Sequence, residues 1–252
     1  MSRVVLPVVE TGPEALFRLG EISVDGPTFR GSMAVGSWLE VAGRTPAGAL
    51  AVLVDDVLGF AIVEDLPSGR WSVSAEITLD LLRPLPGVGE VHVTASLLHL
   101  DDLGGVSTGR VTDDDGTVIA LCTQRGRFIP APPDLVEEGS WGGPVAAGDL
   151  ERLLGARADE PMTATEVLAN EGGNLHGGIS MCVSDLVAGA VAPELVTASV
   201  HITYTRGIPL GSSVTWRPDV RHRGRSLAVV DVDGVVDDRV CTTARVVLHP
   251  PG

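Results

Sequence analysis

The chain has 252 residues, of which 44% are hydrophobic and 20% are charged, which is enough for one large domain or two domains of about 125 residues. Its 33 acidic residues outnumber its 18 basic residues, giving a net charge of −15. That balance disfavours nucleic acid as a partner, because phosphate contacts need local positive charge. All 18 basic residues are Arg, which excludes a lysine Schiff base and a P-loop lysine.

The sequence also indicates where the protein works. No apolar run approaches the roughly 18 residues of a membrane helix, and the N-terminus lacks the features of a signal peptide. The cysteines Cys122, Cys182 and Cys241 are odd in number and widely spaced, which argues against a disulfide framework. We therefore expect a cytoplasmic protein without a membrane partner. Neither the Cys nor the His residues have metal-ligand spacing, so no metal and no cofactor is expected.

In chain order, the first expected helix covers residues 46–64 and the second covers residues 176–192. Both are apolar nearly all round, which predicts buried helices. A strand-like run follows each helix, at 71–89 and at 195–213, and three further strand-like runs come after each. The pattern predicts one helix followed by about four antiparallel strands, present twice.

This repeat defines the expected organisation. It predicts an α+β fold of two units, 1–130 and 150–252, in which an antiparallel sheet wraps around a central helix. The Pro- and Gly-rich residues 131–149 are the expected linker. Joining the two sheets edge to edge would cover exposed strand edges. Residues 1–24 match no element of the repeat.

The stretch from Asn170 to Asp185 carries the most chemistry. Gly177 and Gly178 stand where the second helix should begin, directly after His176, and free N–H groups at a helix start can polarise a carbonyl. Asp185 lies eight residues beyond Gly177, or roughly 12 Å along a helix. An acid and a glycine turn that act together must therefore come from two different helices.

An ungapped alignment of the two repeats predicts which residues correspond. The aligned pairs are Asp185 with Asp56, Gly177 with Gly48, Asn170 with Val41, and His176 with Ala47. Further along the chain, matching Arg206 with Arg83 aligns Thr197 with Ser74. The first repeat therefore keeps an acid but lacks the Asn and the His. Asp55 stands beside Asp56 and is the alternative assignment of that acid.

The order Asn, His-Gly-Gly, Asp at this spacing, with a Ser or Thr on the following strand, resembles the hotdog-fold acyl-CoA thioesterases, in particular the phenylacetyl-CoA thioesterase type. The resemblance covers residues 150–250 well and about 25–130 more weakly. It implies two tandem hotdog units that form a pseudo-dimer with composite sites. Each site would take its Asn and His-Gly-Gly from one unit and its acid and Ser/Thr from the other.

The resemblance implies hydrolysis of acyl-CoA to free acid and CoA. Its expected residues are Asp56, Ser74, Asn170, His176 and Gly177 for catalysis, with Gly178 for substrate binding. The Gly177 N–H would polarise the thioester carbonyl, and Asp56 would act as nucleophile or as general base. The second site, with Asp185, Thr197 and Gly48, lacks the Asn and the His, so one working site and one degenerate site are expected.

A cluster of arginines is the expected phosphate site for CoA. Arg221, Arg223 and Arg225 lie at a predicted turn between strands, and the planar guanidinium suits phosphate. A solvated hairpin tip is the alternative interpretation.

A non-catalytic acyl-CoA-binding or regulatory hotdog protein is the alternative function. Dehydration or hydration of acyl thioesters would need a different Asp/His motif, and no Gly-x-Ser-x-Gly elbow of a serine hydrolase occurs. The acyl group, CoA or acyl carrier protein as the carrier, and a homo-oligomer of such chains all remain open.

Overall fold

The computed structural model describes residues 4–6, 11–64, 66, 68–132, 146, 148–155 and 159–251. Most of the predicted linker 131–149 lies outside these residues. The division of the chain into 1–130 and 150–252 therefore stays a prediction.

Two helices and the strands that follow them dominate both halves of the chain. The first half contains β1 (Val4–Leu6), α1 (Gly12–Leu16), β2 (Ile22–Asp25), β3 (Thr28–Val35), the short 3-10 helices η1 (Ser37–Leu39) and η2 (Ala47–Leu50), α2 (Ala51–Val63), β4 (Arg70–Leu81), β5 (Gly89–Leu100), β6 (Gly104–Asp113) and β7 (Val118–Pro130). The second half contains α3 (Asp149–Leu154), β8 (Pro161–Thr163), η3 (Glu166–Leu168), α4 (Gly177–Val191), β9 (Val196–Tyr204), β10 (Ser213–Arg223), β11 (Ala228–Val236) and β12 (Arg239–His249). Both predicted helices and the four strands after each are confirmed.

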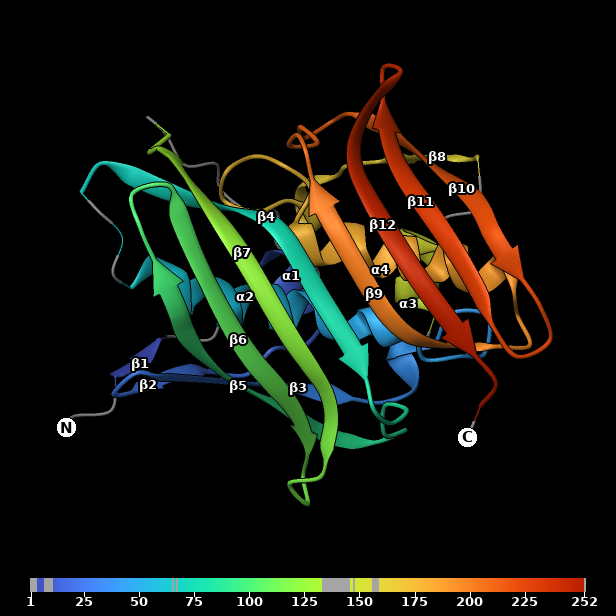
Figure 1. Ribbon diagram of the computed structural model, residues 1–252, viewed down its shortest axis with the longest axis horizontal. Coiled ribbons are helices and arrows are strands. Elements are labelled where there is room, and N and C mark those ends of the chain that lie inside the picture. The colour runs from blue at the N-terminus through green and yellow to red at the C-terminus, as the bar shows by residue number, and fades with distance from the viewer. Residues whose placement is uncertain are drawn as a thin grey trace.

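Within the described residues, the strands form one antiparallel sheet of 12 strands in the order β1-β2-β3-β5-β6-β7-β4-β9-β12-β11-β10-β8. The halves join through β4 and β9, which lie side by side in the middle of the sheet (Figure 1) and pair from Glu76 with Thr203 to Asp80 with Ser199. The joint removes two strand edges that would otherwise be open to other chains. It also makes the two halves one continuous α+β unit.

The strands before each helix are the part of the fold that the repeat did not predict. Residues 1–24 contribute β1, α1 and the start of β2, and β3 extends the sheet by pairing with β5. The burial of β3 alternates along the strand, as expected for a strand with one face on the core. A short alternation of this kind gives a weak sequence signal, which explains why these strands were not expected.

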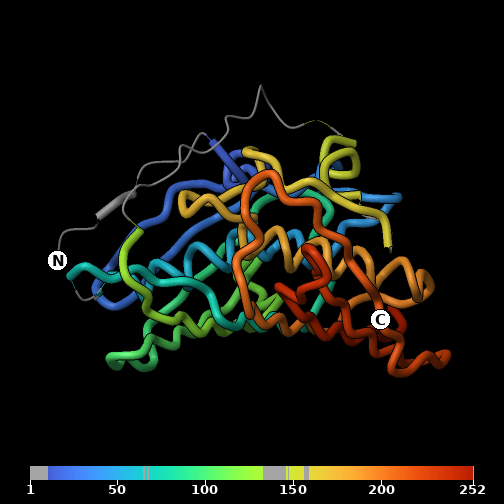
Figure 2. Tube along the Cα trace, turned by 90° about the horizontal axis from the view of Figure 1, so that it is seen from above, coloured from blue at the N-terminus to red at the C-terminus, as the bar shows by residue number. Residues whose placement is uncertain are grey.

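The helices α2 and α4 lie against the concave side of the curved sheet. Figure 2 shows the strands of residues 104–130 and 228–249 below the two helices, with segments of residues 11–35 and 159–175 on the opposite side. Each helix is thus covered from several directions, which explains why both are apolar nearly all round. No described helix combines the length and the apolar character needed to cross a membrane.

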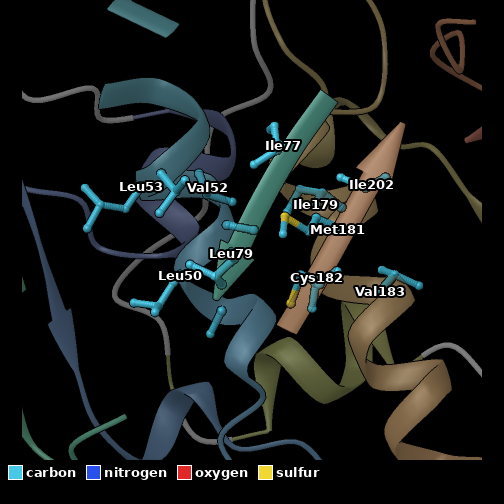
Figure 3. Close-up of a cluster of buried hydrophobic side chains, with 14 of the residues drawn as sticks. Leu50, Val52, Leu53, Ile77, Leu79, Ile179, Met181, Cys182, Val183 and Ile202 are labelled. Atoms are coloured by element: carbon cyan, nitrogen blue, oxygen red, sulfur yellow. The ribbon is translucent and has the colours of Figure 1, made fainter. Parts of the chain in front are cut away.

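One continuous core links the two halves. Figure 3 shows that side chains of both helices and of the two central strands meet in a single cluster. Its fully buried members include Leu50 and Leu53, Ile179 and Val183, and Ile77, Leu79 and Ile202. Each Å² of apolar surface removed from water stabilises the fold by about 25 cal/mol. The shared core therefore holds the two helices against each other and sets how their starts meet.

The helix starts approach so closely that glycine is required on both sides. A Cβ on Gly178 would lie 2.5 Å from Val52 Cα, and a Cβ on Gly48 would lie 2.7 Å from Cys182 Cα. Both distances are to backbone atoms, which cannot move aside alone. The close approach brings each helix start against the side chains of the other helix.

Replacing Gly48 by Ala should therefore lower the free energy of unfolding by about 1–3 kcal/mol, because the added methyl group overpacks the helix contact. The matched control is Gly189→Ala in α4, where a Cβ meets nothing within 4 Å. That change should raise the stability by about 0.5–1 kcal/mol, since Ala is the better helix former. Urea unfolding of both variants measures the difference, and equal effects would contradict the close packing.

Candidate active site

Asp55 is the carboxylate at the centre of the candidate site. It lies in α2, and its Oδ1 accepts hydrogen bonds from Ser74 Oγ at 2.7 Å and from Gln124 Nε2 at 3.0 Å. Gln124 Nε2 also donates to Ser74 Oγ at 2.9 Å. Asp55 Oδ2 accepts the Gly178 N–H of α4 at 3.0 Å. The carboxylate is thus held by two strands of its own half and by the helix start of the other half.

The peptide between Gly177 and Gly178 is held at both ends. Its N–H is bonded to Asp55, and its C=O accepts the hydroxyl of Tyr204 at 2.8 Å. Burial and the charge of Asp55 raise the pKa of Tyr204 well above its usual value, so the hydroxyl stays a donor. A Cβ on Gly177 would lie 2.5 Å from Asp55 Oδ2, so this position also needs glycine. The N–H of Gly177 itself bonds to no described residue.

His176 is surrounded by carboxylates. Its Nε2 lies 3.1 Å from Asp56 Oδ1 and 3.8 Å from Glu14 Oε1, and its Nδ1 lies 3.5 Å from Asp55 Oδ2. Burial disfavours the imidazolium, but the hydrogen bond to Asp56 and the charges of Asp56, Asp55 and Glu14 outweigh it and raise the pKa of His176 to about 10. Burial also raises the pKa of Asp56, against the opposing effect of His176.

The protonation of His176 decides the partner of the Gly178 N–H. That group lies 3.0 Å from both His176 Nδ1 and Asp55 Oδ2. In the imidazolium form Nδ1 is a donor, so the Gly178 N–H bonds to Asp55 alone and the ring N–H faces the same oxygen. In the neutral form Nδ1 can accept the Gly178 N–H. In the neutral form the Gly178 N–H is thus shared between His176 Nδ1 and Asp55 Oδ2.

The same three groups also have the spacing of a cation site. Glu14, Asp56 and His176 each offer one ligand atom, and these atoms lie within 4.8 Å of one another. A histidine must be neutral to ligate a metal, and the raised pKa of His176 opposes that form. The cluster is better described as an imidazolium balanced by carboxylates.

Asp185 forms the corresponding arrangement in the second half. Its Oδ2 accepts the Gly48 N–H at 2.8 Å, and its Oδ1 accepts the Thr197 hydroxyl at 2.5 Å. Burial raises the pKa of Asp185, while its contacts with Thr197 and with the backbone at the start of this helix lower it. Asp185 thus holds the start of the helix in the first half.

These contacts correct the alignment of the repeats by one residue. Gly178 and Gly48 occupy equivalent positions, and so do Asp55 and Asp185. The expected alignment of Asp185 with Asp56 is therefore shifted by one residue: Ser74 bonds to Asp55, whereas Asp56 bonds to His176. The sequence alignment matched Gly48 with Gly177 instead of Gly178, which placed the acid one position too late.

The second arrangement also lacks the glutamine. Ser74 pairs with Gly126 between β4 and β7, and Thr197 pairs with Leu248 between β9 and β12. The residues two positions earlier are Gln124 in β7 and Val246 in β12. A buried valine therefore stands where the first half has an amide that bonds to the acid.

A cavity of about 520 Å³ opens over Asp55, His176 and the Gly177 turn. Its walls include residues of both halves. The apolar wall contains Leu19, Ile22, Phe60, Val63, Leu66 and Trp71 on one side, with Leu175 and Ile208 on the other. Asp185, Thr197 and Gly48 do not line it, so only the arrangement around Asp55 meets this cavity.

The remaining expected residues occupy different places. Asn170 lines the cavity, and its Oδ1 accepts the Asn174 N–H at 3.2 Å, so it shapes the loop before α4. Gly178 has its N–H engaged by Asp55 and packs on the backbone of α2, which leaves it a positioning role instead of the expected substrate contact.

The structure does not bring the arginine cluster to the cavity. None of Arg221, Arg223 and Arg225 lines the cavity. Arg221 bonds to Asp231 at 2.7 Å, and Arg223 contacts Glu194 at 3.3 Å. Carboxylates of the protein therefore already satisfy two of the three guanidinium groups.

Sequence reasoning missed four residues of the site. Gln124 and Tyr204 come from strands far along the chain, and Glu14 comes from the N-terminal segment that matches no repeat element. Asp55 was considered only as the alternative to Asp56. Counting seven residues from Gly178 to Asp185, and then seven from Gly48, would have identified Asp55.

The raised pKa of His176 can be measured directly. In an NMR titration, its ring signals should stay in the imidazolium form at pH 8 and change near pH 10. Asp56→Asn should lower that midpoint, because it removes the nearest negative charge. Since the folded pKa lies above the unfolded value of about 6.5, this group stabilises the fold most below pH 6.5, and that contribution is lost as the pH rises toward 10. A midpoint at or below 6.5 would contradict this description.

Two family models match the chain. The model described as the acyl-CoA thioesterase C-terminal domain matches residues 11–128, and the one described as the N-terminal domain matches residues 166–249. Together they cover both halves, in the reverse of the order that their descriptions give. A comparison with curated protein sequences finds no significant match.

Solved structures of thioesterases share the fold at low sequence identity. The tesB protein of Mycobacterium avium subspecies paratuberculosis has a TM-score of 0.63 at 13% identity, over 94% of this chain and 98% of its own. The 12:0-ACP thioesterase of Umbellularia californica has a TM-score of 0.63 at 15% identity, over 89% and 95% of the two chains. An acyl-ACP thioesterase of Bacteroides thetaiotaomicron has a TM-score of 0.60 at 14% identity, over 88% and 98%.

The two family models assign both halves of the sequence to acyl-CoA thioesterase domains, and the solved structures share the tandem fold. The chain belongs to the hotdog-fold acyl-CoA thioesterase superfamily and is a thioester hydrolase built from two tandem hotdog units.

Proposed function

We propose that the protein hydrolyses acyl-CoA thioesters to free acid and CoA, at one composite site that combines Asp55, Ser74 and Gln124 with His176 and Gly177. The observation that carries the proposal is the position of Asp55. Its carboxylate is fixed by donors from both halves and lines the cavity together with Gly177, whose N–H bonds to no described residue.

The contacts of Asp55 favour a general base over a nucleophile. Oδ1 accepts two hydrogen bonds and Oδ2 accepts one, so direct attack on the thioester carbon would require the carboxylate to give up bonds that hold it in place. The remaining lone pair of Oδ2 can take a proton from water without such a movement. Gln124 Oε1 is buried and has no partner among the described residues. Ser74 and Gln124 would act as positioning residues.

The start of α4 provides the complementary electrostatics. The Gly177 N–H lies at a helix N-terminus, where the unpaired N–H groups carry partial positive charge. A thioester carbonyl oxygen that accepts this N–H would be polarised, and the negative charge that develops on it would be stabilised. His176 lies beside the same turn and would keep positive charge close to Asp55.

The reaction then balances without a cofactor. Asp55 takes a proton as water attacks the thioester carbon, and a tetrahedral oxyanion forms at the Gly177 N–H. The carbon–sulfur bond breaks as the oxyanion collapses, and the proton passes from Asp55 to the leaving thiolate. The products are a carboxylic acid and a thiol. The apolar walls of the cavity suit an uncharged hydrocarbon or aryl acyl group.

Asp55→Asn is the most direct test of the proposed base. The variant should lose at least about 100-fold in kcat, because general-base catalysis typically contributes about 10²- to 10⁴-fold. The matched control is Asp185→Asn, which changes the equivalent residue of the second half and should keep kcat within about threefold. Thiol release from a panel of aryl- and alkyl-CoA thioesters gives the rates, and thermal melts show whether each variant is folded.

Asp56→Asn tests whether the catalytic base is Asp55, as proposed, or Asp56, as expected from the sequence. Because Asp56 acts through His176, its loss in kcat should be smaller than that of Asp55→Asn. A larger loss for Asp56→Asn would restore Asp56 as the central acid, and a dead Asp185→Asn would place the working site in the other arrangement. Tight binding of acyl-CoA without turnover across the panel would favour the binding or regulatory function instead.

A further inference from the structure

We propose that Arg127 and Arg206, at the mouth of the cavity, bind the phosphates of the CoA carrier. This inference rests on the proposed function and assigns a phosphate site that differs from the cluster around Arg223. It predicts that the protein distinguishes CoA thioesters from thioesters of the same acyl group that carry no phosphate.

Acidic side chains line the cavity and would repel the phosphates of CoA. Four acidic side chains line it, Glu14, Asp55, Asp56 and Glu171, and the whole chain has a net charge of −15. A carrier with several phosphates would be repelled unless local positive charge opposed that field. Apart from His176 deep in the site, Arg127 and Arg206 are the basic residues among the described residues that line the cavity.

Each half of the chain contributes one of the two arginines. Arg127 is near the end of β7, and Arg206 lies two residues after the end of β9. Both are exposed, whereas Asp55 and His176 at the base of the cavity are buried. A thioester bound at the base would extend its pantetheine arm toward the exterior, which brings the phosphates to these rim residues.

Neither arginine is neutralised within the part of the chain that the structure describes. Arg206 donates from Nη1 to the carbonyl of Val240 at 3.2 Å, which leaves its other N–H groups available. Arg127 forms no ion pair with a described carboxylate. Their neighbour Arg125 lies 3.6 Å from Glu76, and Arg221 and Arg223 are also paired with acids. A guanidinium group at the cavity mouth that is not paired with a carboxylate can donate two parallel hydrogen bonds to a phosphate.

The repeat supplies a matched control residue. Arg83 and Arg206 both follow a central strand, and their backbone N–H groups bond to Ile119 O and to Cys241 O respectively, each at 3.1 Å. Both side chains are exposed, but Arg83 does not line the cavity. Arg83→Gln therefore removes the same charge from a comparable position outside the site.

The test compares two substrates that share one acyl group, its CoA thioester and its pantetheine thioester, which lacks the phosphates. For acyl-CoA, Arg127→Gln and Arg206→Gln should each raise KM about threefold, and the double variant about tenfold, with kcat nearly unchanged; exposed ion pairs have effects of this size. For acyl-pantetheine, neither KM nor kcat should change. Added salt should raise the wild-type KM for acyl-CoA alone.

The outcomes separate the two proposals. Equal KM increases for both substrates would mean that the arginines shape the mouth without binding phosphate, and this would overturn the inference. The same holds if Arg83→Gln raises the KM for acyl-CoA as much as Arg206→Gln does. If the wild type hydrolyses neither substrate, the proposed function itself fails.

Discussion

The structure depends on a reciprocal contact between the starts of two buried helices. Each helix carries an aspartate whose carboxylate accepts a backbone N–H from the start of the other helix, Asp55 from Gly178 and Asp185 from Gly48. A buried carboxylate is costly unless donors satisfy it, and the positive end of a helix is a suitable donor group. The contact requires glycine at both starts, because any Cβ would meet the backbone or carboxylate opposite.

Small differences around this symmetric contact produce one site instead of two. Asp55, Ser74, Gln124 and Gly177 all line the cavity, whereas Asp185, Thr197 and Gly48 do not. Val246 replaces the amide of Gln124 in the second half. The proposed asymmetry therefore follows from the position of the cavity and from the glutamine that the second half lacks.

The sequence predicted the fold to the level of its repeat. Each helix gives a long apolar run, and alternating strand-like runs follow both of them in the same order, so the helices and these strands were predicted correctly. The identity of the central acid was more difficult, because Asp55 and Asp56 are adjacent and only the contact with Gly178 distinguishes them. Gln124 and Glu14 had no signal at all, since they reach the site only through strand pairing and through the N-terminal segment.

The central claim is that substrate binds once per chain, with its carbonyl between Gly177 and Asp55. A crystal structure with an acyl-CoA analogue in which a methylene group replaces the thioester sulfur tests it most directly. We expect one analogue per chain, with the ketone oxygen at the Gly177 N–H and the carbonyl carbon facing Asp55. An analogue bound at Asp185 and Gly48, or a carbonyl that faces Asp56, would contradict the account.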